Sequence, residues 1–596
     1  MRSIPRLMLV ALFALFLLTI TEAQIPPKRE FRAAWIATVV NLDWPTSRTA
    51  DPNTQRSQLV TILDGLKSAG INAVVFQIRP ECDAFYPSSI EPWSYWLTGQ
   101  QGKAPSSPFD PLQFAIDEAH KRGMELHAWF NPYRAERVAG NYALDPRHVT
   151  VLHPDWVIQM GTYRFLNPGM KVVRDYVASV ISDVVRRYEI EGAHMDDYFY
   201  QDGISTQDTA TFRAESRGFT NIGDWRRDNV NSLLKQINDS IKAIKPNVKW
   251  GISPRGIWKN GVPSGIIGSD NYSVIFCDAV AWLQGRYIDY IAPQLYWPFG
   301  GNQDYGKLMP WWSSQRNGRH LYVGQGSYRI VDGSNWGASE VPNQIRLNRI
   351  NSYAQGSIFF RAKLGLIDNP KGLVDSMVND LYKYPALRPI MSWKDTVVPN
   401  LPASLAVTRL ATSASVTWAA PLAAIDGGVA EQYVVYRSTS LPILIEDPRN
   451  IVSIQFAATY TEPSLPPPGV TYYYGVTALD HMQNESMLSN IMGLNSGGVV
   501  GVDDRPAVAM NFSLYQNYPN PFNPTTVISF QLPSEQHITL KVYDLLGREV
   551  RVLVDGVLSA GYHNVQFGGS GLASGVYIYR IAAGEHVVSK KMQLMK

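Results

Sequence analysis

The pattern of apolar and polar residues changes period repeatedly from residue 28 to about residue 390. Short apolar runs typical of buried strands alternate with longer segments in which apolar residues recur every three or four positions, as in helices packed on a sheet. The strand-like runs are Phe31 to Val40, Asn72 to Arg79, Glu125 to Phe130, Glu191 to Tyr200, Lys249 to Ser253, Tyr290 to Tyr296, His320 to Gln325 and Ser357 to Arg361. The helix-like segments that follow them are Thr54 to Ser68, Pro111 to Arg122, Val172 to Tyr188, Trp225 to Ile244, Tyr272 to Arg286, Tyr305 to Arg316, Val341 to Tyr353 and Gly372 to Tyr382.

This alternation predicts an α/β fold, a (β/α)₈ barrel over residues 28–390. The alternative is an open, doubly wound sheet. No glycine-rich phosphate-binding fingerprint follows the first strand, which argues against a dinucleotide-binding version of that sheet. In a barrel the carboxyl ends of all strands meet at one rim, so side chains that follow the strands are expected to form a site there.

Polar and aromatic residues follow every predicted strand. In strand order they are Asp43 and Trp44; Arg79, Glu81 and Asp83; His127, Trp129, Asn131 and Arg134; His194, Asp196, Asp197 and Tyr198; Arg255; Gln294, Tyr296 and Trp297; Gln325 and Tyr328; and Arg361. Many such groups on one rim predict a site, in which the residues other than the four acids of the second and fourth strands bind substrate. For Arg79 and Arg361 the alternative is that they only neutralise rim acids, and for His127 that it is a buried barrel histidine.

The reactive groups available on this rim are carboxylates. The sequence contains no Gly-x-Ser-x-Gly elbow, no zinc signature and no P-loop, so we expect neither a metal nor a cofactor. Glycoside hydrolysis needs two carboxylates, one as general acid and one as nucleophile or base. Asp196 is the first candidate for the nucleophile because it shares side-chain parity with His194, so both can point into the barrel mouth.

The other acids have less defined roles. Asp197 would face a neighbouring strand or a substrate hydroxyl, and Asp83 and Glu81 are the leading candidates for the acid. A nearby carboxylate and stacked aromatic rings would raise the pKa of that acid. Which carboxylate plays which role stays open, as does the alternative that Asp196 and Asp197 are loop acids that cap the next helix.

Composition narrows the class of ligand. The chain has 596 residues with a net charge of +3, so it offers no basic surface for nucleic acid. Aromatic residues make up 11%, including 16 Trp and 31 Tyr, which suits stacking on sugar rings. We expect most of these residues instead to fill the interior of the barrel and of the β domains.

The first residues resemble a targeting segment. Arg2 and Arg6 precede the apolar run Leu7 to Ile20, and Ala23 offers a small residue for cleavage. We therefore expect a signal peptide over residues 1–23 and no transmembrane segment in the mature chain, because this run is short for a membrane span. An uncleaved anchor is the alternative.

The last third of the chain changes to short alternating segments. A proline-bearing linker, Val397 to Pro402, precedes segments that predict a β-sandwich over residues 398–493. They are Ala403 to Thr408, Ala414 to Ala419, Glu431 to Arg437 and Val470 to Ala478. Asn495 to Asp504 is a glycine-rich linker, and a final β domain is expected over residues 512–596.

Several motifs of the barrel carry a family resemblance. They are Phe31-Arg32-Ala33-Ala34-Trp35-Ile36-Ala37 with Asp43-Trp44-Pro45, Arg79-Pro80 with Asp83 to Ser88, Ala119 to Trp129 with Asn131-Pro132-Tyr133-Arg134, His194 to Tyr200, and Ala292 to Trp297. In this order, over residues 30 to about 385, they resemble the glycosyl-hydrolase-like 10 family. That resemblance implies a fold similar to (β/α)₈ glycosidases, and it implies a cell-wall glycan, such as peptidoglycan strands stripped of peptide, as one substrate.

The two β domains carry resemblances of their own. Thr471 to Ala478 looks like the late strand of a fibronectin type III domain, a module that usually acts as a spacer and can bind glycan. Leu514 to Thr526, Val542 to Val550, Leu572 to Tyr577 and the basic end at Lys590-Lys591 resemble the C-terminal sorting domain of type IX secretion. This implies the type IX machinery as a partner and passage through the periplasm to the outer surface, with release or attachment there.

Two functions from different classes remain. One is a secreted glycoside hydrolase with a polysaccharide substrate. The other is an inactive barrel that binds surface glycan with the same aromatic rim, and a lyase or transglycosylase acting on the same polymer is a third option. A second carboxylate within about 5–10 Å of Asp196 would favour hydrolysis.

Overall fold

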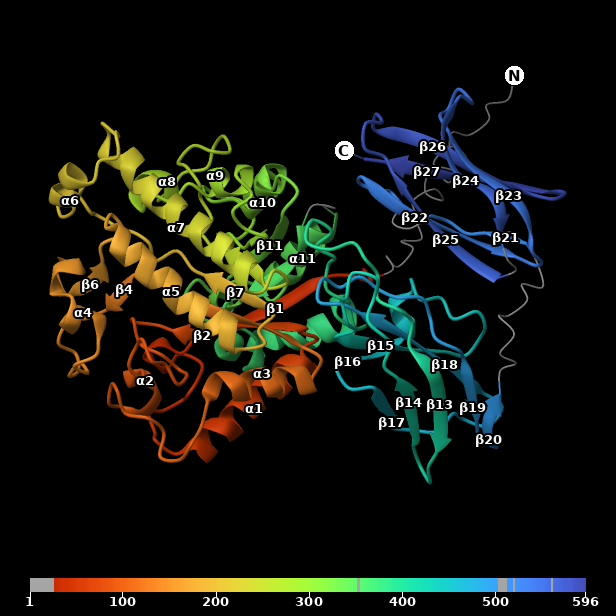
Figure 1. Ribbon diagram of the computed structural model, residues 1–596, viewed down its shortest axis with the longest axis horizontal. Helices are drawn as coiled ribbons and strands as arrows, with labels where there is room; N and C mark the ends of the chain where they lie inside the picture. The colour runs from red at the N-terminus through yellow and green to blue at the C-terminus, as the bar shows by residue number, and fades with distance from the viewer. Residues whose placement is uncertain (1–25, 351–353, 502–511, 518–519, 559–560, 596) are drawn as a thin grey trace, which may run out of the picture.

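The computed structural model describes residues 26–350, 354–501, 512–517, 520–558 and 561–595. The predicted signal peptide, residues 1–23, lies outside the described residues. Figure 1 shows a large α/β body on the left and two smaller all-β bodies on the right. This arrangement confirms the predicted fold class, a barrel followed by two small β domains.

The first body is a closed barrel of parallel strands. Its sheet runs in the order β10-β11-β12-β1-β2-β3-β7-β8-β9, and pairing of β11 with β9 closes the ring, which excludes the open sheet. The short strands β9 and β10 together form the sixth position. The strands are β1 Phe31–Ile36, β2 Ala73–Arg79, β3 Glu125–Phe130, β7 Gly192–Met195, β8 Lys249–Ile252, β9 Tyr290–Ile291, β10 Gln294–Leu295, β11 His320–Gln325 and β12 Ala354–Phe359.

Helices lie between successive strands and bury their apolar faces against the outer surface of the barrel. The principal ones are α1 Pro52–Ser68, α3 Pro111–Lys121, α5 Lys171–Arg187, α7 Ile222–Ile244, α9 Ala279–Gln284, α10 Tyr305–Gln315 and α11 Glu340–Ile350. Two of them begin at an Asp-Pro pair whose aspartate, Asp51 or Asp110, accepts two backbone N–H groups of the first turn. The capping oxygen and the fixed φ of proline explain why α3 begins at the predicted residue and why α1 begins at Pro52, two residues before the predicted Thr54.

Several predicted elements are shorter or broken; the strand predicted over 191–200, for example, is only β7, and the strand predicted over 290–296 is split into β9 and β10. The first strand ends at Ile36 rather than Val40, because the Asp43 carboxylate turns the chain back by accepting the N–H of Ala37 at 2.9 Å. The helix predicted over 272–286 is two pieces, α8 Asn271–Val274 and α9, since Asp278 caps a new helix. The closing helix predicted over 372–382 is regular only in α12, Leu373–Ser376.

An antiparallel sheet interrupts the barrel after β3. It consists of β4 Arg134–Glu136, β5 Val157–Met160 and β6 Tyr163–Leu166, in the order β4-β6-β5. The short helices α2 Tyr95–Thr98 and α4 Val149–Leu152 belong to the neighbouring loops, and α6 Thr209–Ala214 follows β7. Because β4 begins four residues after β3 ends, this sheet extends the rim side of the barrel.

The second body is the predicted sandwich of two sheets. One sheet has the order β13-β14-β17 and the other β16-β15-β18-β19-β20, with one core between them. The strands are β13 Ala403–Arg409, β14 Ala414–Ala419, β15 Gln432–Ser438, β16 Ile451–Gln455, β17 Thr459–Glu462, β18 Thr471–Leu479, β19 Met492–Asn495 and β20 Gly498–Gly501. The last of these lies inside the segment predicted as a linker, because it pairs with β19 as a hairpin.

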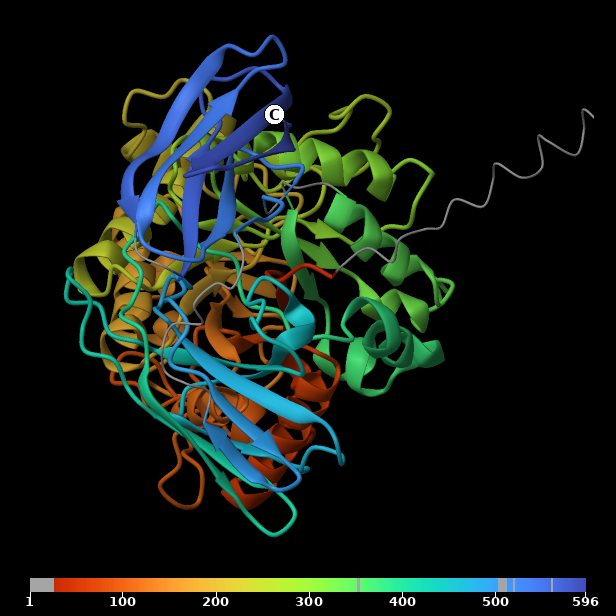
Figure 2. The ribbon, with the colours of Figure 1, turned by 90° about the vertical axis from the view of Figure 1, so that its right-hand side faces the viewer.

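This sandwich closes the floor of the barrel, the end at which the strands begin (Figure 2). The apolar core inside the barrel includes Met391 and, from the sandwich, Met482. Both side chains are almost fully buried, and each contributes on the order of 1.5–3 kcal/mol by leaving water. Ion pairs add to the junction, among them Lys28 with Glu485 at 2.7 Å. The predicted barrel boundary at residue 390 leaves out Met391, which belongs to this core.

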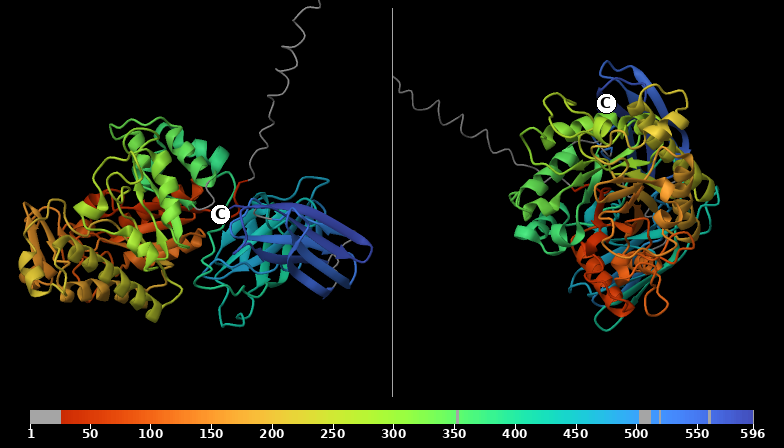
Figure 3. Two further views of the ribbon diagram at one scale, coloured as in Figure 1. Left: turned by 90° about the horizontal axis from the view of Figure 1, so that it is seen from above. Right: turned by 90° about the vertical axis from the view of Figure 1, so that its left-hand side faces the viewer.

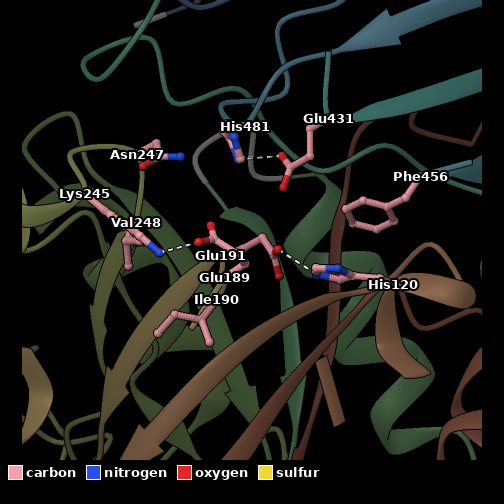
Figure 4. A pocket seen from close by; sticks show the side chains of 10 residues that line it. All are labelled: His120, Glu189, Ile190, Glu191, Lys245, Asn247, Val248, Glu431, Phe456 and His481. Atoms are coloured by element: carbon pink, nitrogen blue, oxygen red, sulfur yellow. Dashed lines mark hydrogen bonds and ion pairs between the residues drawn. The ribbon is translucent and has the colours of Figure 1, made fainter. Parts of the chain in front are cut away.

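A cavity of about 230 Å³ lies in this junction (Figure 4). His120 of the barrel pairs with Glu191 at 2.8 Å and stacks on Phe456 of the sandwich. On the sandwich side, His481 pairs with Glu431 at 2.9 Å. The barrel floor and the sandwich therefore meet through titratable groups as well as through apolar packing.

The third body is a smaller β domain with its own core. Its sheets have the orders β21-β22-β25 and β24-β23-β26-β27, and Figure 3 shows it from two further sides. The strands are β21 Ser513–Leu514, β22 Thr525–Leu532, β23 Gln536–Tyr543, β24 Glu549–Leu558, β25 Gly561–Gly568, β26 Gly575–Ala583 and β27 His586–Leu594. Among the helices of the described ranges, none has the length and apolar character that a membrane span requires.

Candidate active site at the barrel rim

Asp196 follows β7 directly and is held by neighbours on β3. Its Oδ2 accepts the indole N–H of Trp129 at 2.9 Å and an amide N–H of Asn131. Only 3% of the residue is exposed. Burial, and then the neighbouring Asp197 carboxylate, raise the pKa of Asp196 to about 8, against the opposing effect of Arg134. At neutral pH this carboxyl group therefore carries a proton that it can donate.

Asp197 points the other way and lies in a cationic environment. One oxygen accepts an amide N–H of Gln294 at 2.9 Å, and the other accepts Nε–H of Arg255 at 3.1 Å. The same guanidinium pairs with Asp202, whose side chain is 47% exposed. The predicted opposite parity of the two adjacent acids is thus what the structure shows, and it gives them opposite electrostatic environments.

Aromatic rings line the rim across from these acids. Tyr296 and Phe360 are stacked with ring centroids 5.8 Å apart, and Tyr328 meets both edge-on at 5.9 and 5.7 Å. All three are partly exposed. Trp297 is partly buried against the core. On the acid side, Tyr198 is exposed and stacks over the guanidinium of Arg134 at 4.4 Å. Flat rings on two sides of a carboxyl pair suit a bound sugar ring.

Glu81 and Asp83 lie in a closed loop network instead of the open rim. Glu81 accepts the indole N–H of Trp96 at 2.6 Å, the hydroxyl of Tyr142 at 3.1 Å and a backbone N–H. Asp83 is fully buried and accepts from Gln101 at 3.3 Å. Burial, followed by the Glu81 charge, raises the pKa of Asp83 to about 7. That value suits an acid, but neither carboxyl shares a hydrogen-bond partner with Asp196 or Asp197, so we do not carry these two into the catalytic proposal.

Three predicted rim residues, Arg79, Arg361 and Asp43, have structural partners. Arg79 is buried in a fork with Glu91, and this pair holds the loop after β2. Arg361 pairs with Asp43 at 3.0 Å, so both join strand ends one and eight. The predicted binding residues that donate a hydrogen bond to one of the two acids are Trp129, Asn131, Tyr198, Arg255 and Gln294, the third of them through its backbone. Arg134 donates to Asn131 and so supports the site indirectly.

Trp44 does not line the rim. It is fully buried, packs against Phe76 and Phe85, and donates its indole N–H to the backbone of Gln55 at 2.9 Å. Gln325 is also buried and donates to Tyr305 at 3.3 Å. A residue that directly follows a strand can pack under the helix layer, and sequence spacing alone does not separate that case from a rim position.

His127 and His194 lie inside the barrel, below the rim. His127 contacts Glu125 and the hydroxyl of Tyr290, and His194 contacts the same hydroxyl from above. Burial lowers the pKa of both imidazoles, so both are neutral. His127 is therefore a buried barrel histidine, which was the alternative interpretation, and His194 is a second one.

The sequence analysis missed three residues of this rim. Phe360 directly follows β12, where an alternating pattern predicts one more strand residue. Asp202 lies in the loop after β7 and meets Arg255 only through the fold. Tyr163 comes from β6, and burial raises its pKa, with Asp196 and Asp197 among the charges that act on it. Only Phe360 had a local signal, namely its position at a strand end.

The site holds no candidate metal centre. Over the ranges that the structure describes, no group of three or more His, Cys, Asp or Glu side chains is placed to bind a metal ion. The chemistry that the visible groups support is proton donation from Asp196 next to a carboxylate that stabilises positive charge.

The fold and this carboxylate-bearing rim define a (β/α)₈ barrel of the glycosidase type. Residues 30–339, just over half of the chain, match the family described as Glycosyl hydrolase-like 10, and the chain belongs to that family. Residues 516–595 match the secretion system C-terminal sorting domain. The third body is thus a sorting domain, which supports secretion or a cell-surface location.

Individual relatives agree with this assignment. The chain is 43% identical to the glycosyl hydrolase YngK of Bacillus subtilis over 68% of its own length and 83% of that protein. It is 37% identical to the glycosyl hydrolase DigH of Escherichia coli strain K12 over 55% of its length and 82% of that protein. The glycoside hydrolase domain of PgaB from Bordetella bronchiseptica superposes with a TM-score of 0.40 at 12% identity, covering 59% of this chain and 98% of that domain. A similarity of that size supports no inference about this chain.

Proposed function

We propose that this protein is an exported glycoside hydrolase that uses Asp196 as its general acid. The observation that supports this role is the raised pKa of Asp196, about 8, at the end of β7 beside a second carboxylate. This assignment replaces the nucleophile role expected from side-chain parity, because a carboxyl group that is protonated at neutral pH donates a proton before it attacks.

In the proposed reaction Asp196 gives its proton to the glycosidic oxygen as the bond from that oxygen to the anomeric carbon breaks. Asp197, held by Gln294 and Arg255, stabilises the positive charge that develops on the sugar ring. Water then forms a new bond to the anomeric carbon and gives one proton to the Asp196 carboxylate, which returns Asp196 to its neutral form. The stacked rings of Tyr296 and Phe360 hold the sugar across from the acids.

The substrate that we propose is a polysaccharide, with peptide-free peptidoglycan glycan as the leading candidate. YngK and DigH are named as glycosyl hydrolases, which supports the reaction class. The partly exposed aromatic rings of the rim support a polymer of sugar rings as ligand. The competing function is a glycan-binding barrel without turnover.

Asp196→Asn tests the role of the acid. We expect turnover on a verified glycan to fall by about three orders of magnitude or more, because catalytic groups contribute on that scale. Glycan binding and the melting temperature should be retained. An aryl glycoside whose leaving group needs no proton should recover much of the rate. Reducing-end release from peptide-free peptidoglycan glycan and from a panel of polysaccharides measures the first effect.

Asp202→Asn is the matched control, because Asp202 is an exposed rim carboxylate that also pairs with Arg255. It should keep most of the turnover. Wild-type turnover in Asp196→Asn would place the acid elsewhere. Loss without rescue by the good leaving group would return Asp196 to the nucleophile role, and a wild type that binds but cleaves nothing would favour the binding barrel.

We further propose that the chain crosses the inner membrane with a cleaved signal peptide and reaches the surface through the type IX system. The matched sorting domain supports the second step. Deleting residues 512–596 should leave glycan cleavage unchanged and retain the protein in the periplasm. Normal export of the shortened chain would contradict the route.

A further inference from the structure

A continuous line of buried polar groups runs through the barrel from below the rim to the floor. Trp35 Nε1 lies 3.2 Å from His194 Nε2, and His194 Nδ1 lies 3.0 Å from the hydroxyl of Tyr290. The same hydroxyl lies 2.8 Å from His127 Nδ1, and His127 Nε2 lies 3.3 Å from the Glu125 carboxylate. None of the five residues is more than 2% exposed.

The direction of every hydrogen bond in this line follows from its two end groups, the Trp35 indole, which donates, and the Glu125 carboxylate, which accepts. The indole of Trp35 can only donate, so His194 Nε2 accepts and its proton sits on Nδ1. Nδ1–H then donates to the oxygen of Tyr290, whose own O–H donates to His127 Nδ1. The proton of His127 therefore sits on Nε2 and donates to Glu125. Burial lowers the pKa of both rings, so both are neutral, and for two neutral rings facing an ionised Glu125 these opposite tautomers are the arrangement that satisfies all four contacts.

The barrel interior leaves room for this line at two glycines. A Cβ at Gly192 of β7 would lie 2.5 Å from the His127 ring, and one at Gly251 of β8 would lie 2.0 Å from the Tyr290 ring. Both separations are shorter than real contacts allow, so a side chain at either position would displace the ring. The line thus depends on small residues on β7 and β8.

The lower end of the line is anchored by cations and by the second domain. Glu125 pairs with Lys249 at 2.5 Å and with Arg388 at 3.0 Å. Gln483 of the sandwich donates to Glu125 at 3.4 Å, and Arg388 donates to Gln432 of the sandwich. The acceptor that sets the direction of the line is therefore held in part by a domain outside the barrel.

The upper end reaches the support of Asp197 and lies two residues before Asp196 in the chain. His194 precedes Asp196 by two residues on one face of β7. Its Nε2 also lies 3.1 Å from the hydroxyl of Ser253, and the Ser253 carbonyl accepts from Gln294, the residue that donates to Asp197. A rotation of the His194 ring would disturb Ser253 and thereby the amide that orients Asp197.

We propose that Tyr290, His127 and Glu125 are positioning residues that hold His194 in its Nδ1–H tautomer, and that the second domain completes this device at the barrel floor. The effect that we propose on catalysis rests on the proposed glycoside hydrolase function. The opposite tautomers of the two histidines are a structural statement that does not depend on that function. The second domain is then a component of the catalytic unit and not only a spacer.

Nitrogen-15 NMR of histidine-labelled full-length protein tests the structural part without substrate. Signals are assigned with His127→Gln and His194→Gln. Between pH 6 and 8 we expect both rings to be neutral, with the proton of His194 on Nδ1 and that of His127 on Nε2. The same tautomer on both rings, or a cationic ring, would overturn the proposal.

Tyr290→Phe tests the catalytic part, with Tyr322→Phe as its matched control. Tyr322 is another buried barrel tyrosine whose hydroxyl contacts a histidine, His320 at 2.9 Å, but it is outside the line. Both variants should lower the melting temperature similarly. Only Tyr290→Phe should lower kcat by about 10- to 100-fold with little change in KM, which is the scale of small misplacements in a site.

Equal loss of kcat in both variants would show a merely structural role and would also overturn the proposal. If the wild type cleaves no glycan, the proposed function fails instead. The tautomers then still decide whether the line exists, and the effect of Tyr290→Phe and Tyr322→Phe on glycan affinity replaces kcat as the measure of positioning.

Discussion

Two carboxylates buried at opposite ends of the same barrel, Asp196 at the rim and Glu125 at the floor, have pKa values shifted in opposite directions. Both are almost fully buried, at 3% and 1% exposure. Burial raises the pKa of both. At Asp196 the neighbouring Asp197 adds to that increase, whereas at Glu125 the charges of Lys249 and Arg388 outweigh burial and the pKa falls.

The two pKa shifts differ because the nearby cations pair with Glu125 at the floor but not with Asp196 at the rim. At the floor, two cations lie within 3.0 Å of Glu125, and the group stays ionised as a structural ion pair. At the rim, Arg255 is directed to Asp197 and Asp202, so Asp196 receives only neutral indole and amide donors. One end of the barrel thus stabilises a charge, while the other keeps a transferable proton.

The largest effect on stability is expected at the floor. Glu125→Gln leaves Lys249 and Arg388 as buried cations without their carboxylate, which typically costs about 3–5 kcal/mol. Asp196→Asn should raise the free energy of unfolding at pH 7, because it removes a carboxyl that the unfolded state ionises and the folded state keeps protonated. Denaturant unfolding of the two variants side by side measures the contrast.

The double variant Glu125→Gln with Lys249→Met sharpens this prediction, because it removes one of the two unpaired cations and should recover part of the lost stability. If Glu125→Gln unfolds at the wild-type denaturant concentration, the floor charges are not held as the structure shows.

The next effect concerns pH at the rim. Proton donation by Asp196 requires its neutral form, so kcat/KM should fall as pH rises through about 8. Asp197→Asn removes the like charge that raises this pKa, and the alkaline limb should move to lower pH. The pH profiles of wild type and Asp197→Asn on one glycan measure the shift. An alkaline limb that stays in place would mean that another group controls it.

The free energy of unfolding should also depend on pH through the protonation of Asp196. The folded pKa of Asp196 lies above the ordinary value of about 3.9, so the folded state holds a proton that the unfolded state has lost. The contribution of this group to stability therefore falls as pH rises from about 4 to about 8, and Asp196→Asn should flatten that slope. Glu125 acts in the opposite sense, because its lowered pKa stabilises the fold at neutral pH and that stabilisation is lost only in strong acid.

The smallest effect is expected at the junction cavity of Figure 4. Despite burial, Glu191 raises the pKa of His120, and Glu431 raises that of His481. The charged groups that face these rings are Glu191, Glu431, Asp117 and Lys249. The stabilisation is fully present below the unfolded value of about 6.5 and is lost as pH rises through the higher folded values.

Melting of the full chain across this pH range, against the double variant His120→Gln with His481→Gln, measures the loss. The variant should melt lower than wild type in mild acid and approach it at pH 8.5. A difference independent of pH would mean that the rings contribute by packing on Phe456 rather than by charge.

The periodicity of the chain predicted most of the fold because helices and strands depend on local side-chain patterns. The bounds of β3 and β11 match the predicted strands, and the helices that begin at Asp51-Pro52 and Asp110-Pro111 carry their own capping groups. The position of Asp196 at a strand end was equally local, and barrel topology then required it to lie at the rim.

Tertiary structure alone decided which partners surround each carboxylate and which carboxylates hold a proton at neutral pH. Glu81 and Asp83 look like rim acids until Trp96, Tyr142 and Gln101, from distant loop positions, enclose them. The closed floor likewise needs Gln483, 358 residues away from Glu125. A pKa reports the sum of burial and charges from the whole surrounding structure, and no local pattern encodes those neighbours.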